Sequence, residues 1–208
     1  MNPSILKGSP DPNRCPWCAG SEIYENYHDT VWGVPNFDDR ELFAKLCLDG
    51  QQAGLSWLTI LKKMQNYYRA YDNFNPEKII NYGEKDFTRL LSNPGIIRNK
   101  LKIRSIIANS KAFVKMEDDG ESLSDFLWGR INYSPIQNHF SVIREIPTET
   151  PLSREISKDL KKRGFSFVGP TIVYAFMQAV GMVNDHLTTC FRHSECRNLA
   201  EKAAGRSR

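Results

Sequence analysis

Residues 153–181 read SREISKDLKKRGFSFVGPTIVYAFMQAVG, and this stretch determines which kind of helical fold the chain can adopt. A basic amphipathic helix ends at Gly164, the tight turn FSFVG follows, and a second helix begins with Pro170 at its first position. This second helix is apolar on most sides, so we expect it to be buried. Its start exposes unpaired backbone N–H groups and the positive end of the helix dipole, which suits a phosphate group. The stretch is therefore either an ordinary αα-hairpin or a hairpin that contacts a polyanion.

Length and composition are those of an ordinary globular protein. The chain has 208 residues, of which 40% are hydrophobic and 25% are charged, and its formal net charge is +4. This length suffices for a domain with a substantial core, and the charge permits a polyanionic partner without requiring one. The opening residues lack the apolar segment of a secretory leader, and no apolar run is long enough to cross a membrane. We therefore expect a cytoplasmic protein with no membrane partner, whose five cysteines are thiols or metal ligands.

Helical periodicity dominates the chain, and strand-like alternation is scarce. The expected fold class is all-α, with many short helices. Residues 1–13 are rich in Pro, Gly, Ser and Asn, and the tail 194–208 shows no periodicity, so both ends are expected to be flexible. Apart from the hairpin helices, 153–163 and 170–181, helices are predicted over 39–48, 57–68, from Pro76 onward, 96–116 and 122–128.

Two pairs of metal-ligand residues lie at opposite ends of the chain. Cys15 and His28 are near its start, and His186 and Cys190 are near its end, four residues apart. On a helix, residues four apart project from the same face, so the second pair could bind one ion together. Two Cys and two His ligands form a closed tetrahedral zinc site, which is structural rather than catalytic. The alternative is a chance pair among buried cysteines and scattered histidines.

Two further segments carry a family resemblance: YHDTVWG at 27–33 and DGQQAGLSW at 49–57. Together with CPW at 15–17, GFSFVGPT at 164–171 and NDH at 184–186, they closely resemble the 3-methyladenine DNA glycosylase I family, which belongs to the helix-hairpin-helix superfamily of DNA glycosylases. The segments occur in the family's order along most of the chain, so chance matching is remote.

The resemblance implies a single two-lobed helical domain over residues 14–193, whose hairpin at 164–170 contacts double-stranded DNA. It implies a base-excision repair enzyme that hydrolyses the N-glycosidic bond of 3-methyladenine in alkylated DNA, releases the free base and leaves an abasic site. We expect a monomer with one structural zinc ion. The implied zinc ligands are Cys15, His28, His186 and Cys190, with Cys18 and Cys196 as rival sulfur ligands that the family pattern does not require.

The resemblance also implies where the base and the DNA bind. A 3-alkylated adenine is a cation, which aromatic faces attract and whose edge can donate hydrogen bonds to a carboxylate. The implied catalytic carboxylate is Asp49, and the implied walls of the pocket are Tyr27, Trp32 and Trp57. The residues implied to contact DNA are Gly54, Leu55, Gly164, Phe165, Gly169 and Thr171, with Leu55 near the gap that a flipped base leaves. The tryptophans and Leu55 could instead be core residues.

Three positions depart from the family or superfamily pattern. Asp49 stands where family members carry Glu, so its carboxylate reaches one methylene less far. Asn184 stands where the superfamily commonly places a catalytic Asp, and Asp185 follows it. Thr171 stands where strand-cutting members of the superfamily carry Lys. Because Schiff-base chemistry needs an amine, a monofunctional enzyme is expected.

Two other function classes remain open at this stage. A non-catalytic module would bind abasic or alkylated duplex tightly without releasing a base. A metallohydrolase would use the Cys and His residues for catalysis, which requires an open coordination position on the metal. Binding without release of a base would select the first class. Four protein ligands on the metal would exclude the second.

Overall fold

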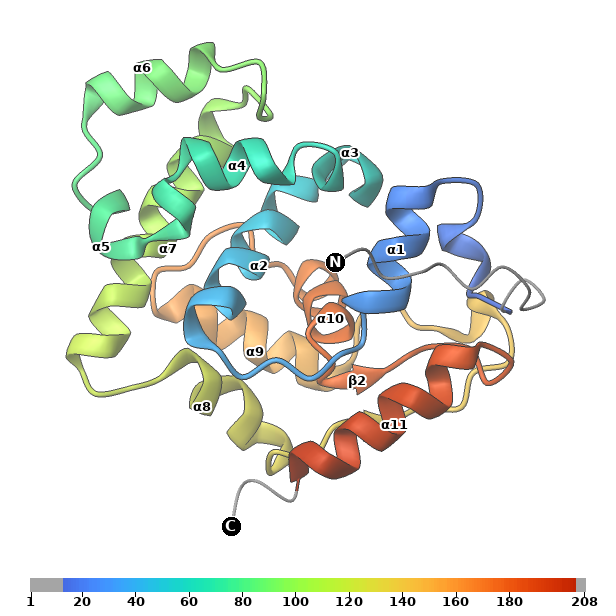
Figure 1. The fold of residues 1–208 in the computed structure, drawn as a ribbon. Coiled ribbons are helices and arrows are strands. Elements are labelled where there is room, and N and C mark those ends of the chain that lie inside the picture. The colour runs from blue at the N-terminus through green and yellow to red at the C-terminus, as the bar shows by residue number, and fades with distance from the viewer. Residues whose placement is uncertain (1–12, 205–208) are drawn as a thin grey trace, which may run out of the picture.

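The computed structural model describes residues 13–204, which are mostly helical (Figure 1). Of the two ends predicted to be flexible, 1–13 and 194–208, residues 1–12 and 205–208 lie outside the described residues. The elements before the hairpin are η1 (Pro16–Cys18), α1 (Glu22–Thr30), α2 (Asp39–Gln52), α3 (Trp57–Leu61), α4 (Met64–Ala70), η2 (Asp72–Phe74), α5 (Pro76–Ile79), α6 (Glu84–Ser92), α7 (Lys100–Asp118), α8 (Leu123–Trp128), η3 (Gly129–Ile131), β1 (Ile136–Gln137) and η4 (Ile143–Glu145). The hairpin helices α9 (Pro151–Lys162) and α10 (Pro170–Ala179), then β2 (Val183–Asn184) and α11 (Phe191–Ala204), complete the fold.

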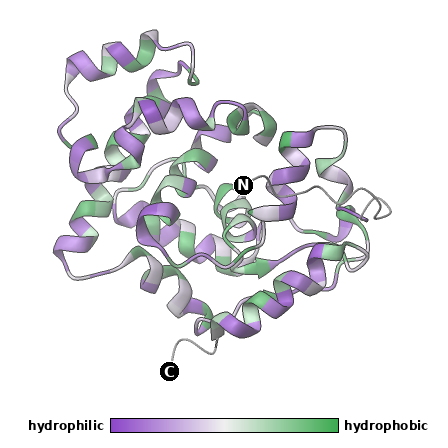
Figure 2. Ribbon diagram, viewed as in Figure 1, coloured by the Kyte–Doolittle hydropathy of each residue, from purple (hydrophilic) through white to green (hydrophobic). Residues whose placement is uncertain are grey.

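Helix α10 lies in the middle of the molecule, with the other helices around it (Figure 1). Its sequence PTIVYAFMQA is apolar on most sides, and Val173, Phe176 and Met177 are fully buried. In Figure 2 this helix is pale to green, whereas the outer helix α11 alternates purple and green. The prediction of a buried helix here is confirmed, although the helix ends at Ala179 instead of Gly181.

The hairpin turn between α9 and α10 is held by side chains of two helices. Gly164 (φ +94°) ends α9 in the left-handed conformation that glycine adopts most easily. Asn109 of α7 accepts a hydrogen bond from the Ser166 N–H (2.8 Å) and donates one to the Ser166 carbonyl (3.2 Å). The Ser157 hydroxyl of α9 donates to the Val168 carbonyl (2.6 Å). The predicted hairpin is therefore present, with its backbone polar groups satisfied.

The two strands form one short parallel ladder, in which Ile136 pairs with Val183. This ladder joins the segment before η4 to the segment after α10, and it is the one departure from an all-α fold among residues 13–204. An apolar core runs without interruption from Tyr27 in α1 to Val183 in β2. The core includes Trp128, whose indole N–H donates to the Asn36 carbonyl (2.8 Å). The division of residues 14–193 into two lobes stays a prediction.

Two predictions from periodicity are corrected. The helix predicted over 57–68 is broken between α3 and α4, because the Lys63 N–H bonds to the Ile60 carbonyl in a tighter turn (2.9 Å). The tail expected to be flexible from residue 194 instead continues α11 as far as Ala204. Cys196 and Ala200, four residues apart, form a buried stripe on this helix. These small side chains gave a weak periodic signal. The helices α1 and α6 were not predicted either, although Phe87, Leu90 and Leu91 of α6 lie at helical spacing.

No helix within residues 13–204 is long and apolar enough to span a membrane.

Gly181 provides a test of how closely the chain packs where α10 ends. Its φ is +74°, and a Cβ there would lie 2.5 Å from the Pro35 nitrogen and 2.8 Å from the Gly33 carbonyl oxygen. We expect Gly181→Ala to lower the free energy of unfolding by about 3 kcal/mol, from backbone strain plus overpacking. Gly120 is the matched control, since it has a similar φ (+78°) but open space around its Cβ position.

Urea unfolding followed by circular dichroism measures both changes. Gly120→Ala should lower the free energy of unfolding by about 1 kcal/mol, from backbone strain alone. Equal effects of the two substitutions would contradict the close contact at Gly181.

Candidate active site and metal centre

Four buried side chains, Cys15, His28, His186 and Cys190, converge from the two ends of the chain. Their ligand atoms all lie within 4.8 Å of one another. The Cys190 Sγ is 3.4 Å from His28 Nε2 and 3.6 Å from His186 Nδ1, and the Cys15 Sγ is 3.7 Å from His186 Nδ1. Cys18 and Cys196 are outside this group, and the Cys18 Sγ bonds instead to the Cys15 carbonyl (3.1 Å). The predicted set of four residues is therefore brought together.

The local structure around His186 and Cys190 differs from the prediction. These residues lie in a turn between β2 and α11, not on a helix. The Cys190 N–H bonds to the Leu187 carbonyl (2.8 Å), and this turn brings the two ligand side chains to the same side. The spacing of four was a useful signal, but the helical reason given for it was wrong.

The distances within the cluster fit a tetrahedral ion. Zinc–sulfur bonds of about 2.3 Å and zinc–nitrogen bonds of about 2.0 Å give sulfur–nitrogen separations of about 3.5 Å in a tetrahedron. The three sulfur–nitrogen distances in the cluster are 3.4, 3.6 and 3.7 Å. These three separations match a tetrahedral site, so the four residues could hold a metal ion.

Outer hydrogen bonds orient both histidines. His28 Nδ1 is 2.7 Å from a carboxylate oxygen of Asp29, which in turn accepts from the Arg14 guanidinium (2.8 Å). His186 Nε2 is 3.1 Å from the Trp32 carbonyl. Each contact places the ring proton on the outer nitrogen and leaves the inner nitrogen to face the cluster, as in metal-ligating histidines.

Ionisation in the cluster also suits a metal. Burial lowers the pKa of His186, so its ring is neutral. A hydrogen bond from Cys15 lowers the pKa of Cys190 to about 2, while the same contact raises the pKa of Cys15. The lowered pKa of Cys190 favours its thiolate, which is the form that binds metal.

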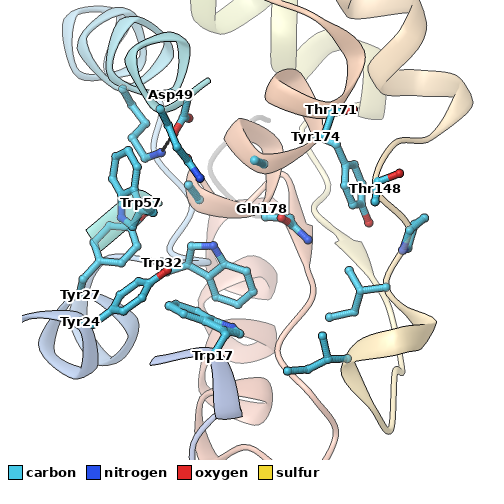
Figure 3. Close-up of a pocket in the computed structure, with 17 residues that line it drawn as sticks. Trp17, Tyr24, Tyr27, Trp32, Asp49, Trp57, Thr148, Thr171, Tyr174 and Gln178 are labelled. Carbon is cyan, nitrogen blue, oxygen red and sulfur yellow. Dashed lines mark hydrogen bonds and ion pairs between the residues drawn. The ribbon is translucent and has the colours of Figure 1, made fainter. Parts of the chain in front are cut away.

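A cavity of about 330 Å³ lies beside this cluster, because its lining residues Trp17 and Trp32 contact the His28 and His186 rings. Figure 3 shows the residues that line it. Its walls come from segments far apart in the sequence. Trp17, Tyr24, Tyr27 and Trp32 form one wall from the N-terminal segment, Asp49 and Trp57 come from α2 and α3, and Thr171, Tyr174 and Gln178 of α10 face them (Figure 3). The predicted pocket residues Tyr27, Trp32, Asp49 and Trp57 therefore all line one cavity.

Asp49 is the carboxylate of this cavity, and it is paired. Its side chain is 2% exposed and forms an ion pair with Lys45, one turn earlier on α2. Burial raises the pKa of Asp49, and Lys45 opposes that rise; burial lowers the pKa of Lys45, and Asp49 opposes that fall. The second carboxylate oxygen of Asp49 and the indole N–H of Trp57 are buried without a hydrogen-bond partner among the described residues.

A second buried carboxylate, Asp185, orients the opposite wall. It accepts hydrogen bonds from the Tyr174 hydroxyl (2.6 Å), from Gln178 Nε2 (2.8 Å) and from Asn138 Nδ2 (2.6 Å). Burial, together with the hydrogen bond that the hydroxyl donates to Asp185, raises the pKa of Tyr174. Asp185 therefore fixes two side chains of the cavity wall without lining the cavity itself.

Comparison with known proteins places this arrangement in a family. The methyladenine glycosylase family model matches residues 17–193. The chain belongs to the methyladenine glycosylase family. It is 49% identical over 177 residues to the DNA-3-methyladenine glycosylase of Haemophilus influenzae, covering 85% of this chain and 96% of that protein. It is equally similar to DNA-3-methyladenine glycosylase 1 of Escherichia coli, with 95% of that protein covered.

Solved structures of family members share the fold. A crystal structure of 3-methyladenine DNA glycosylase I matches with a TM-score of 0.85 and 50% identity, covering 86% of this chain and 98% of that one. A Staphylococcus aureus 3-methyladenine DNA glycosylase I, solved to study 3-methyladenine recognition, matches with a TM-score of 0.83 and 38% identity, covering 86% and 95%. The expected family and its helical fold are thus confirmed.

Three of the residues predicted to contact DNA meet beside the cavity. Gly54, Leu55 and Thr171 line a second hollow that also reaches Asp49. Leu55 is 40% exposed, and Lys102 holds its loop by donating from Nζ to the Ala53 carbonyl (2.7 Å). The predicted intercalating position is therefore an exposed residue on a fixed loop.

The other three belong to the hairpin turn. Gly164 is exposed, Gly169 is the residue before the first turn of α10, and neither lines either hollow. Phe165 is buried (3% exposed), so any contact that it makes with DNA would go through its backbone. Their contacts with DNA stay a prediction.

Several residues of the site were missed from the sequence. Lys45 is the most important, and its spacing of four from Asp49 was a readable signal, since helix neighbours four apart can pair. Trp17 was not among the predicted pocket residues, yet it lines the cavity and contacts the His28 ring (5.2 Å between centroids). Tyr24, Tyr174 and Gln178 had no sequence signal that distinguished them from core or surface residues.

Asp185 offers a test of the outer hydrogen-bond network. In Asp185→Asn an amide N–H₂ would replace one of the two accepting oxygens and face at least one donor, so we expect the free energy of unfolding to fall by about 2 kcal/mol. Tyr174→Phe removes a single donor and should lower it by about 1 kcal/mol. Chemical unfolding compares the two variants, and an Asp185→Asn protein as stable as wild type would show that the network does not hold the wall.

Proposed function

We propose that this chain is a monofunctional DNA glycosylase that hydrolyses the N-glycosidic bond of 3-methyladenine in alkylated double-stranded DNA. Its named relatives are DNA-3-methyladenine glycosylases, and one family structure holds 3-methyladenine. The observation that carries the proposal is a buried carboxylate, Asp49, in a cavity whose other walls are largely aromatic. Such a cavity suits a flat cationic base.

The chemistry follows from the charge of the lesion. A 3-alkylated adenine carries a positive charge in DNA, and its glycosidic bond is weakened because the base departs neutral. The protein therefore needs to select the cation and stabilise the electron-poor sugar, rather than to supply a strong general acid. Normal adenine is neutral and gains little from a carboxylate or an aromatic face, so selectivity follows from charge.

We assign these roles to the residues of the cavity. Asp49 accepts a hydrogen bond from the edge of the flipped base through its unpartnered oxygen, and Tyr27, Trp32 and Trp57 form the aromatic walls. The Tyr27 and Trp57 rings, with centroids 5.4 Å apart, form one corner of the cavity. Water attacks the sugar. Thr171 carries no amine, which supports hydrolysis without strand cleavage.

We propose that the DNA lies across the second hollow and the hairpin. Leu55, on the loop after α2, would fill the space that the flipped base leaves. The exposed turn glycine Gly164 and the start of α10 at Gly169 would approach the phosphate backbone. A monomer suffices, since every residue in these assignments comes from one chain.

We also propose that Cys15, His28, His186 and Cys190 hold one structural zinc ion. A mixed thiolate and imidazole set favours zinc. Four protein ligands leave no open position for a substrate, which argues against a metallohydrolase. When bound, the ion supplies a fixed cross-link between the chain's two ends, and the residues of the cavity carry the chemistry.

Asp49→Asn tests the assigned carboxylate. The amide keeps the shape but loses the charge, so we expect the rate of 3-methyladenine release from alkylated duplex to fall by about 10- to 100-fold. Chromatography of the free base measures the rate, and Asp49→Glu is the matched control because it keeps the charge. Release by Asp49→Asn at the wild-type rate would remove Asp49 from its role, whereas tight binding of lesion DNA by wild type without any release would favour a non-catalytic lesion sensor.

Metal analysis and stability test the zinc assignment. We expect about one zinc ion per wild-type chain, and Cys190→Ser should lose it and unfold more easily by at least about 3 kcal/mol. Cys18→Ser is the matched control, because Cys18 is a buried neighbour outside the cluster. Wild-type protein without metal, or a Cys190→Ser variant that retains it, would refute the assignment.

A further inference from the structure

The cavity already contains a positive charge that belongs to the protein. Lys45 lines it, and its ammonium forms an ion pair with Asp49. The same ammonium lies over the face of Trp57, 4.1 Å from the ring centroid. A carboxylate and a tryptophan face are the two features assigned above to recognition of a cationic base. The lysine therefore occupies the place of the substrate's charge.

We propose that Lys45 is a specificity-determining residue, an internal cation that competes with the charged lesion for Asp49 and the Trp57 face. This inference rests on the proposed function of the same cavity. It adds that the free enzyme is charge-neutral at this site and that a lesion binds by displacing the ammonium from the carboxylate.

The charge balance of the cavity supports this competition. Its titratable side chains are Lys45 and Asp49 from α2, Tyr24 and Tyr27 from α1, and Tyr174 from α10. The tyrosines are neutral near pH 7, so Lys45 cancels the one negative charge. A bound cationic base beside this pair would add a second positive charge within the same small volume. Two like charges so close in a poorly solvated cavity repel each other, so one of them leaves.

The fold provides a second place for the lysine. Lys45 also lines a larger neighbouring groove of about 710 Å³, together with Glu41 and Asp38. Glu41 lies one helical turn before Lys45 and Asp49 one turn after it, so a flexible lysine side chain can pair with either carboxylate. Glu41 is exposed, and its carboxylate accepts a hydrogen bond from the Tyr68 hydroxyl (3.3 Å). We assign Glu41 as the partner that receives the displaced ammonium.

Substitution of Lys45 tests the competition. Lys45→Met keeps a side chain of similar length without the charge, so the lesion no longer has a competitor. We expect the second-order rate constant for 3-methyladenine release from methylated duplex to rise about tenfold. Lys45→Arg retains the charge and should give no increase. Lys202→Met on the exposed face of α11 controls for the loss of one positive charge from a DNA-binding protein.

A second variant leaves the Lys45–Asp49 pair intact. Glu41→Gln removes the alternative partner, so it should lower lesion release about threefold in the wild-type background. In the Lys45→Met background the same substitution should have no effect. This coupling between two side chains would not arise if Lys45 only stabilised the fold.

Calorimetry separates this inference from the proposed function. An N9-alkylated 3-methyladenine, which keeps the positive charge of the lesion, and the matching neutral N9-alkylated adenine are each titrated into wild type and Lys45→Met. The preference for the cationic base should increase about tenfold in the variant.

If neither wild type nor any variant released the base, the proposed function would be refuted. The calorimetric preference would still decide the role of Lys45. Slower release by Lys45→Met with normal release by Lys45→Arg would overturn the inference, because the ammonium would then assist the reaction. An unchanged rate and an unchanged preference in Lys45→Met would overturn it as well.

Discussion

A single buried carboxylate, that of Asp49, sets the requirements for the rest of the site. An isolated charge in a largely aromatic cavity is strongly unfavourable, so it needs either a partner or a proton. Here the partner is Lys45, one turn away on the same helix. The cavity is thus built to hold a positive charge against a negative one. In the free protein that charge is the lysine, and in the proposed complex it is the alkylated base.

The cluster of Cys15, His28, His186 and Cys190 shares structural elements with the cavity, so an ion bound in the cluster would also hold one wall of the cavity in place. Trp17, Tyr24, Tyr27 and Trp32 all lie in the short N-terminal segment that carries Cys15 and His28. The Trp32 carbonyl accepts a hydrogen bond from the His186 ring. The Trp32 side chain also packs against that ring, with the two ring centroids 4.5 Å apart. An aromatic wall on so short a segment needs a fixed anchor, and the four-residue cluster supplies one.

Much of the fold and part of the site could be predicted from the sequence. The hairpin was predictable because its glycines and Pro170 have strong local preferences, and α10 because it is apolar on most sides. The four cluster residues and the four pocket residues were identified through family motifs. Local rules failed where the contacts are long-range or the signal is weak. No periodicity indicates that Asp185 will bind Tyr174, Gln178 and Asn138, or that a turn will align His186 with Cys190. Lys45 was overlooked because the predicted helix stopped at residue 48, one position before its partner.

The most direct measurement is a crystal structure of the protein with a cationic N9-alkylated 3-methyladenine bound. The account predicts that the base lies in the aromatic cavity with its edge on the Asp49 carboxylate, and that the Lys45 ammonium has turned away toward Glu41. A base bound outside this cavity would contradict the account, and so would a base bound within it while the Lys45–Asp49 pair stays intact.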